Sequence, residues 1–143
     1  MKEIKFVRLS PHAKPPVRVH GGDAGADLCA VGDHVVRPGA TVLVPTGVAV
    51  EVPHGFVGDV RPRSGLAAKL GVTVLNAPGT IDAGYTGEVK VLLHNTSRKP
   101  VIITQGDRIA QLVILPVALP AFVEVGALGD TARGVGGFGS TGV

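Results

Sequence analysis

The sequence predicts an all-β sandwich or barrel in a single domain of 143 residues. Apolar runs of about five residues alternate with Gly and Pro, a pattern typical of short strands joined by tight turns. The 21 Gly and 11 Pro follow no three-residue period, which excludes a collagen-like helix. Hydrophobic residues make up 45% of the chain and charged residues 17%, a composition that favours a packed core over disorder.

The predicted strands lie between the Gly and Pro positions. Prolines end the first strand, and turns at Pro38-Gly39 and His54-Gly55 separate later ones. The expected strands are 4–9, 26–31, 35–38, 41–45, 48–52, 56–60, 72–75, 88–94, 101–103 and 109–115, with 122–125 as a candidate for the last one.

One segment, Ser-Gly-Leu-Ala-Ala-Lys-Leu-Gly, predicts a two-turn helix, because Ser64 suits an N-cap and Gly71 suits the position after the last turn. The N-terminus of such a helix presents free N–H groups. Arg61, Arg63 and Gly65 stand beside it, which indicates a site for phosphate. A capped helix with two surface arginines explains the segment equally well.

Charge and composition exclude several classes of partner. The net charge of +3 comes without a long basic run, so we expect no nucleic-acid partner. The single cysteine, Cys29, lies in an apolar stretch and fits a core position better than a nucleophile. The apolar stretch 109–125 is interrupted by Gln111, Pro116 and Pro120, so we expect no membrane partner. No secretory signal is evident, and we expect a cytoplasmic protein.

The C-terminal segment 133–142 is rich in glycine, and ordering it alone would cost too much entropy. It nevertheless carries Arg133, Ser140 and Thr141, which suit phosphate, and Phe138, which suits stacking on a base. A plain disordered terminus is the alternative. We interpret the segment as a flexible arm that closes over a ligand, although no Walker pattern occurs in the chain.

The connection 76–87 contains two side chains suited to chemistry among small residues. Asp82 can hold and deprotonate a water, and Tyr85 can pack on a sugar. An ordinary Asp turn with an exposed Tyr is the simpler reading of this segment alone.

Three further positions carry polar groups. Asp27, placed at the edge of a turn, suits a hard cation such as Mg²⁺, although a plain turn aspartate is the simpler reading. Asp107 and Arg108 are expected to pair with each other at a strand entrance. Gln111 is a polar side chain inside an apolar run. The five histidines show no metal-ligand spacing.

In chain order, these segments resemble the five motifs of the homotrimeric dUTPase family. The resemblance covers nearly the whole chain and implies a jelly-roll-like, distorted β-barrel of the β-clip type, with residues 133–143 as a flexible arm. It also implies a homotrimer with three active sites shared between subunits, which hydrolyse dUTP to dUMP and pyrophosphate with Mg²⁺. The matching segments are 24–28, 62–67, 79–88, 106–112 and 133–142.

The resemblance also implies roles for individual residues. Asp82 would activate the water that attacks the α-phosphorus, Tyr85 would exclude a ribose 2′-hydroxyl, and Asp27 would hold the hydration shell of Mg²⁺. The remaining substrate-binding positions are the hairpin residues Asn76, Gly79, Thr80 and Ile81 for uracil, then Arg63, Ser64, Gly65 and Gln111 for phosphate, and Arg133, Phe138, Gly139, Ser140 and Thr141 in the arm.

Two alternatives stay open from the sequence. A dCTP deaminase shares the fold and trimer, but it would need a catalytic Glu and a different loop in the hairpin. A non-catalytic nucleotide-binding module could keep the fold while losing Asp82 or the arm, and this chain keeps both.

Overall fold

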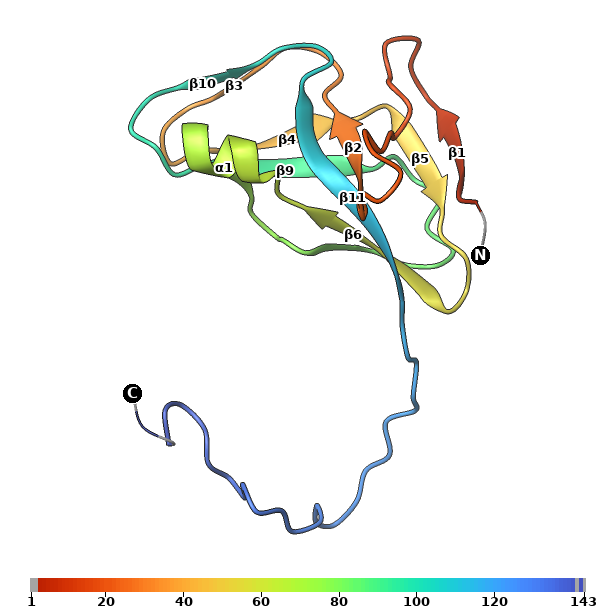
Figure 1. Cartoon of the computed structure of the whole chain (residues 1–143), viewed down its shortest axis with the longest axis vertical. Helices are drawn as coiled ribbons and strands as arrows, with labels where there is room; N and C mark the ends of the chain where they lie inside the picture. Colours follow the sequence, from red (N-terminus) through yellow and green to blue (C-terminus); the bar gives the residue numbers. More distant parts are fainter. Residues whose placement is uncertain (1–2, 141, 143) are drawn as a thin grey trace.

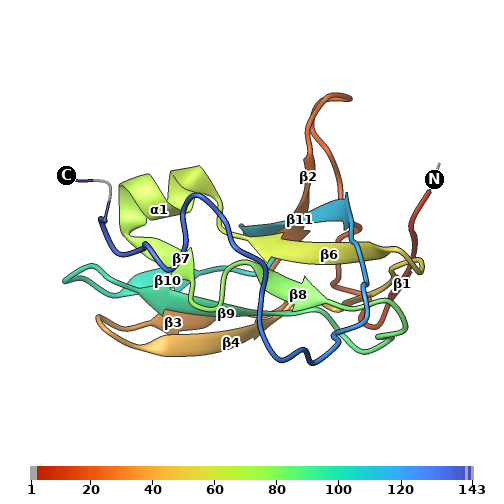
Figure 2. The ribbon, with the colours of Figure 1, turned by 90° about the horizontal axis from the view of Figure 1, so that it is seen from below.

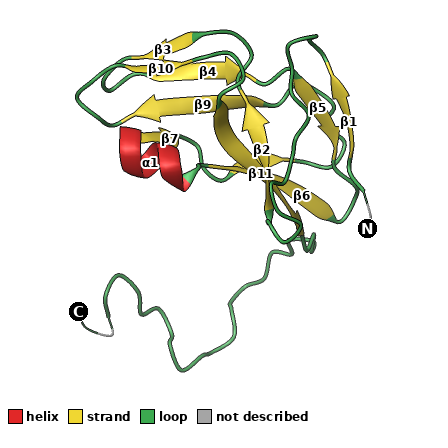
Figure 3. Ribbon diagram, turned by 45° about the horizontal axis from the view of Figure 1, so that its top comes forward, coloured by secondary structure: helices red, strands yellow, loops and turns green. Residues whose placement is uncertain are grey.

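A computed structural model describes residues 3–140 and 142 of the chain. It shows a body of short strands with one helix, and a long C-terminal segment that leaves this body (Figures 1 and 3). The elements are β1 (Lys5–Arg8), β2 (Gly25–Cys29), β3 (His34–Val36), β4 (Thr41–Pro45), β5 (Val48–Glu51), β6 (Phe56–Arg61), α1 (Ser64–Leu70), β7 (Val72–Val74), β8 (Gly79–Ile81), β9 (Lys90–Asn95), β10 (Val101–Ile103) and β11 (Arg108–Pro116).

The strands form four sheets, and every pairing between named strands is antiparallel. The largest has the order β2-β11-β6-β8, the next is β4-β9-β7, and β1-β5 and β10-β3 form pairs. Figure 2 shows β6 and β11 in one layer and β3, β4 and β9 in another. The all-β, jelly-roll-like class is therefore confirmed, although the hydrogen-bonded strands of the described residues do not close a barrel.

The core lies between these layers and consists of aliphatic side chains. Leu28 on β2, Leu93 on β9 and Ile109 on β11 are almost fully buried. They and their Val and Ala neighbours form one cluster, which supplies the apolar area that stabilises a chain with few aromatic residues. Burial of these side chains fixes the register of the strands in the two larger sheets. The polar residues of these strands then lie on the faces that point away from the core.

The helix begins one residue earlier than predicted. Arg63, not Ser64, is the N-cap, its backbone is extended, and it makes no side-chain capping bond. A guanidinium has no acceptor for the free N–H groups of a helix, and the side chain of Arg63 forms an ion pair with Asp27. The C-terminus is as predicted, because Gly71 adopts the left-handed conformation with φ of 66°.

Two strand predictions were wrong. Residues 122–125 form no strand, because the chain has already left the sheets and these residues pair with nothing among the described residues. Conversely, β8 lies inside the segment that the sequence presented as a connection. Its three residues pair with β6, and this pairing was hidden because a strand of only three residues that begins with Gly, directly after Pro78, gives too short a pattern to stand out from a loop.

The C-terminal segment separates from the body after β11. The N–H of Val117 donates to the carbonyl of Gly55 at 2.9 Å, and beyond it every hydrogen bond among the described residues joins the segment to itself. Phe122 and Phe138 are fully exposed. The departure point lies well before residue 133, so a long apolar stretch precedes the glycine-rich part. In the described part of the chain, α1 is the sole helix, far too short to cross a membrane.

Candidate functional site

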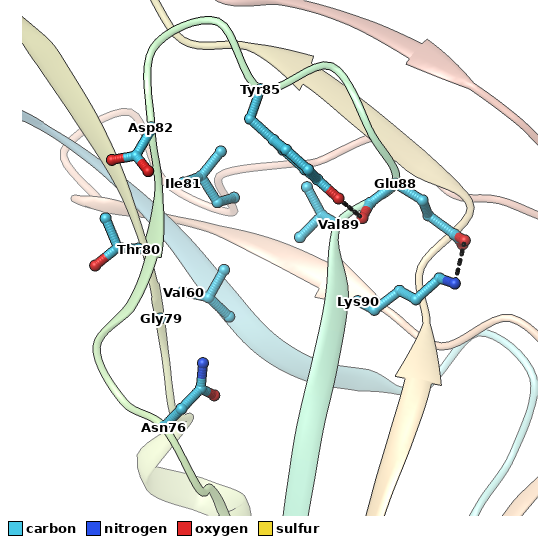
Figure 4. Close-up of a pocket in the computed structure, with 10 residues that line it drawn as sticks. All are labelled: Val60, Asn76, Gly79, Thr80, Ile81, Asp82, Tyr85, Glu88, Val89 and Lys90. Atoms are coloured by element: carbon cyan, nitrogen blue, oxygen red, sulfur yellow. Dashed lines mark hydrogen bonds and ion pairs between the residues drawn. The ribbon is translucent and has the colours of Figure 1, made fainter.

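A small cleft of about 190 Å³ opens between the two limbs of the hairpin that joins β7 to β9. Figure 4 shows Asn76 at one end of the cleft, and Asp82 and Tyr85 at the other, near the turn. The structure thus brings together the hairpin residues that the sequence singled out. The lining residues are Val60, Asn76, Gly79, Thr80, Ile81, Asp82, Tyr85, Glu88, Val89 and Lys90.

Tyr85 is held by the limb that returns to β9. Its hydroxyl donates to the carbonyl of Glu88 at 3.0 Å. Its ring lies against Gly87, where an added Cβ would stand 2.5 Å from the Tyr85 hydroxyl oxygen. Only glycine therefore permits this ring position. About half of the side chain stays exposed, so the ring offers its free surface to a ligand.

Asp82 lies beside Tyr85 and differs from it in having no partner. Its side chain is exposed and makes no hydrogen bond or ion pair with the described residues. A carboxylate in this state is free to accept a hydrogen bond from a water or a ligand hydroxyl.

A second cleft, of about 300 Å³, lies at the N-terminus of α1. Gln111 lines this cleft, and its side-chain amide donates to the carbonyl of Pro62 at 2.9 Å. Gly25 is required opposite, since a Cβ there would collide with the Gln111 carbonyl oxygen. The lining residues are Val19, Asp23, Ala24, Gly25, Asp27, Arg63, Ser64, Gly65 and Gln111.

Asp27 organises the charges of this second cleft. It lies within β2 rather than at a turn edge, and its carboxylate is mostly buried. Arg63 Nε lies 2.9 Å from one carboxylate oxygen, and Arg108 Nη1 lies 3.3 Å from the other. A buried carboxylate needs such partners, and here they also hold Arg63 at the cleft.

The expected pair between Asp107 and Arg108 does not form. Asp107 instead accepts the backbone N–H of Thr104 at 2.8 Å and closes the turn before β11. Arg108 is therefore free to reach Asp27 across the sheet, and its role in the second cleft was missed from the sequence. Glu88, Lys90 and Val60 in the hairpin cleft were likewise missed, because no local pattern marks them as lining residues.

The residues of the second cleft accommodate a Mg²⁺ ion only in part. Among the described residues, no three His, Cys, Asp or Glu side chains come close enough to hold a metal ion. Asp27 is one carboxylate with two arginine partners. Mg²⁺ is commonly held by one carboxylate together with substrate phosphates and water, and Asp27 fits that arrangement.

The two clefts are separate within one chain. They share no lining residue. The hairpin cleft is built on β8 and the second cleft on β2, which are the two outer strands of the same four-stranded sheet. Three strand spacings separate them, or about 14 Å. The residues predicted to bind a base and those predicted to bind phosphates therefore lie at opposite edges of the sheet.

Among the described residues of the arm, none lines either cleft. Arg133 Nε donates to the carbonyl of Gly136 at 3.0 Å, within the arm itself. Phe138 and Gly139 occupy a turn in which both φ values are positive, and Ser140 N–H donates to the carbonyl of Gly137. Thr141 lies outside the described residues.

The chain matches the family model described as dUTPase over residues 12–142. It is 54% identical, over 97% of this chain and 85% of the other, to the deoxyuridine 5′-triphosphate nucleotidohydrolase of Rhodococcus erythropolis. Among solved structures it resembles the dUTPase of Staphylococcus bacteriophage 80alpha with dUPNHPP, at a TM-score of 0.93 and 30% identity over 100% of both chains. A dUTPase mutant from phage phi11 of S. aureus, described with a structural Mg(II) ion, is 28% identical with a TM-score of 0.84, over 90% of this chain and 100% of that one.

Cys29 lies next to Asp27 at the end of β2 and is buried. Burial raises the pKa of its thiol above the ordinary value, and the charge of nearby Lys14 only partly opposes this. Because the folded-state pKa is raised, the thiolate fraction at pH 8 is smaller than in a free cysteine.

We therefore expect native protein at pH 8 to react with Ellman's reagent more slowly than free cysteine, by on the order of tenfold or more. The reaction should accelerate as the pH rises toward the thiol pKa. In guanidinium chloride, one thiol per chain should react at the ordinary rate. Rapid reaction of the native protein at pH 8 would contradict the buried position of Cys29.

Proposed function

The chain belongs to the dUTPase family and is an enzyme, and we propose that it hydrolyses dUTP to dUMP and pyrophosphate at sites assembled from several copies of the chain. The observation that carries the proposal is the hairpin cleft, which unites Asn76, Asp82 and Tyr85. A group for the base, a group for the sugar and a free carboxylate for water stand in one small space.

The base is proposed to enter at the Asn76 end of the cleft. The Asn76 amide and the backbone of Gly79, Thr80 and Ile81 would bind the uracil edge. A cytosine would present the opposite donor and acceptor pattern there and leave buried groups unpaired, which is a large penalty. The narrow cleft, of about 190 Å³, also supports exclusion of the 5-methyl group of thymine.

The sugar and the attacking water are assigned to the turn end of the hairpin. Tyr85 would stack on the deoxyribose and leave no room for a 2′-hydroxyl. Asp82 would accept a proton from water, whose oxygen attacks the α-phosphorus. The bond from that phosphorus to the bridging oxygen breaks, and pyrophosphate leaves. Alignment and charge neutralisation carry most of such a reaction.

The phosphates are assigned to the second cleft. Arg63 and the backbone around Ser64 and Gly65 would bind phosphate oxygens, and Gln111 would add a donor. When bound on the triphosphate, Mg²⁺ would neutralise negative charge, with Asp27 beside its hydration shell. The phage phi11 relative described with a structural Mg(II) ion supports a role for this cation.

Two features support a shared site in a homotrimer. The base and phosphate clefts lie on opposite edges of one sheet, and the arm packs against neither. We therefore propose that the hairpin of one subunit meets the second cleft of a neighbour. An arm would then close the site, with Arg133, Ser140 and Thr141 on the β and γ phosphates, and with Phe138 and Gly139 over the base. Closure would expel water from the site.

The reaction would keep uracil out of DNA and supply dUMP for thymidylate synthesis. The direct test is a pyrophosphate-release assay with dUTP, dTTP, dCTP and UTP, together with an ammonia assay on dCTP. We expect dUTP to exceed the others in kcat/KM by a factor of 10² or more, on the order of a lost buried hydrogen bond or a steric clash. Ammonia release from dCTP would favour the deaminase instead.

The role of Asp82 is tested by Asp82→Asn. The amide keeps the size of the side chain but cannot take a proton from water, so kcat should fall by about 10²–10⁴-fold while dUTP affinity changes little. Single-turnover kinetics and equilibrium binding of a non-hydrolysable analogue separate these two effects. Near-normal turnover would remove Asp82 as the water-activating group.

The shared site is tested by mixing two inactive chains. Asp82→Asn supplies an arm without a working hairpin, and a chain lacking residues 134–143 supplies a hairpin without an arm. If the arm acts on a neighbouring subunit, trimers reassembled from both should recover activity well above either parent.

If the arm acts within its own chain, no site in the mixture contains both parts and activity stays at the level of the parents. Size-exclusion chromatography of each parent provides the control that both still assemble.

A further inference from the structure

We propose that Glu88 is a positioning residue for sugar selection, because it fixes the returning limb of the hairpin, and with it Tyr85, onto the turn between β4 and β5. The inference rests on the proposed function, in which Tyr85 excludes a ribose 2′-hydroxyl. Glu88 itself would touch neither the sugar nor the reacting atoms.

The turn between β4 and β5 is a rigid anchor. Gly47 has a positive φ of 65°, and a Cβ on it would lie 2.7 Å from the Cβ of Ala13 and 3.0 Å from Val31 Cγ2. The peptide is also bonded on the other side, because the carbonyl of Gly47 accepts the N–H of Leu9 at 2.7 Å. Packing and hydrogen bonding therefore leave this turn little freedom to move.

The returning limb is attached to this anchor by three hydrogen bonds. The N–H of Gly47 donates to Glu88 Oε1 at 2.8 Å. The hydroxyl of Thr46 donates to the carbonyl of Val89 at 2.6 Å, and the N–H of Val89 donates to the carbonyl of Val48 at 2.8 Å. Glu88 is the one limb residue that uses its side chain, and it holds the position nearest to Tyr85.

The attachment is transmitted directly to the ring of Tyr85. The Tyr85 hydroxyl donates to the carbonyl of Glu88 (Figure 4). The carboxylate of the same residue accepts the N–H of Gly47. The two bonds make a continuous path from the core-packed turn to the aromatic ring. A shift of the Glu88 peptide would therefore move the ring.

The second contact of the Glu88 carboxylate contributes little. Lys90 Nζ lies 3.6 Å from its other oxygen, and the lysine side chain is nearly half exposed. An exposed ion pair at this distance is weak and screened by salt. Position 88 thus requires a side chain that is long enough to reach Gly47 and that carries a hydrogen-bond acceptor. It does not require a negative charge.

The test compares Glu88→Met, which keeps the length but removes the acceptor, with Glu88→Gln, which keeps the acceptor but removes the charge. The measured quantity is the ratio of kcat/KM for dUTP to that for UTP. In Glu88→Met the ratio should fall roughly tenfold or more, since small displacements of a positioning group have effects of this size. In Glu88→Gln it should stay close to the wild-type value.

The matched control is Glu51→Met. Glu51 lies on β5, its side chain is exposed, and among the described residues that side chain has a polar contact only with Lys5, at 3.4 Å. It should keep the wild-type ratio. For Glu88→Met, kcat with dUTP should change less than the ratio of kcat/KM for dUTP to that for UTP. A general loss of stability would lower activity with both substrates and would leave this ratio unchanged.

Different results would contradict the role of Glu88 and the proposed function. An unchanged ratio in Glu88→Met, or an equal loss in Glu88→Gln, would overturn the role of the Gly47 hydrogen bond. If Glu88→Met does not fold, Tyr85→Phe replaces it as the test variant, because this change removes the hydrogen bond from the Tyr85 hydroxyl to the Glu88 carbonyl. An unchanged ratio of kcat/KM for dUTP to that for UTP in Tyr85→Phe would overturn the proposal. Wild-type protein that fails to prefer dUTP over UTP would instead contradict the proposed function.

Discussion

Strand β11 lies inside the largest sheet, and its pairings fix the positions of the strands on either side. It pairs with β2 on one side and β6 on the other, so its register places Gln111 opposite both Asp27 and Arg61. The same register places Gln111 at the second cleft, and the C-terminal segment leaves the body where β11 ends at Pro116. A one-residue slip would turn Gln111 into the core and bring apolar side chains to the cleft.

The polar interactions of the second cleft depend on this register. Asp27 is stable in a mostly buried position only because two guanidinium groups lie against its oxygens. In return, the carboxylate orients Arg63 at the N-terminus of α1. The cleft is thus organised before any ligand arrives, which lowers the cost of ordering charged side chains on binding.

The hairpin cleft follows a different principle. Its residues lie on a loop, and loops are mobile unless something ties them to the core. Here the turn between β4 and β5 provides the tie through Gly47, while β8 ties the other limb to β6. The C-terminal segment after β11 represents the opposite extreme, since its two aromatic side chains, Phe122 and Phe138, are fully exposed. The residues of the proposed site therefore lie apart from one another within a single chain.

Turn chemistry and hydrophobic pattern act between near neighbours, so the sequence predicted the all-β class, most strand positions, the helix near Ser64 and the segments that resemble family motifs. Only the tertiary structure decided that Arg108 pairs with Asp27, 81 positions away, and that Glu88 binds Gly47, 41 positions away. It also showed β8 where the sequence indicated a loop. Such contacts depend on strand order and register, and no local propensity carries that information.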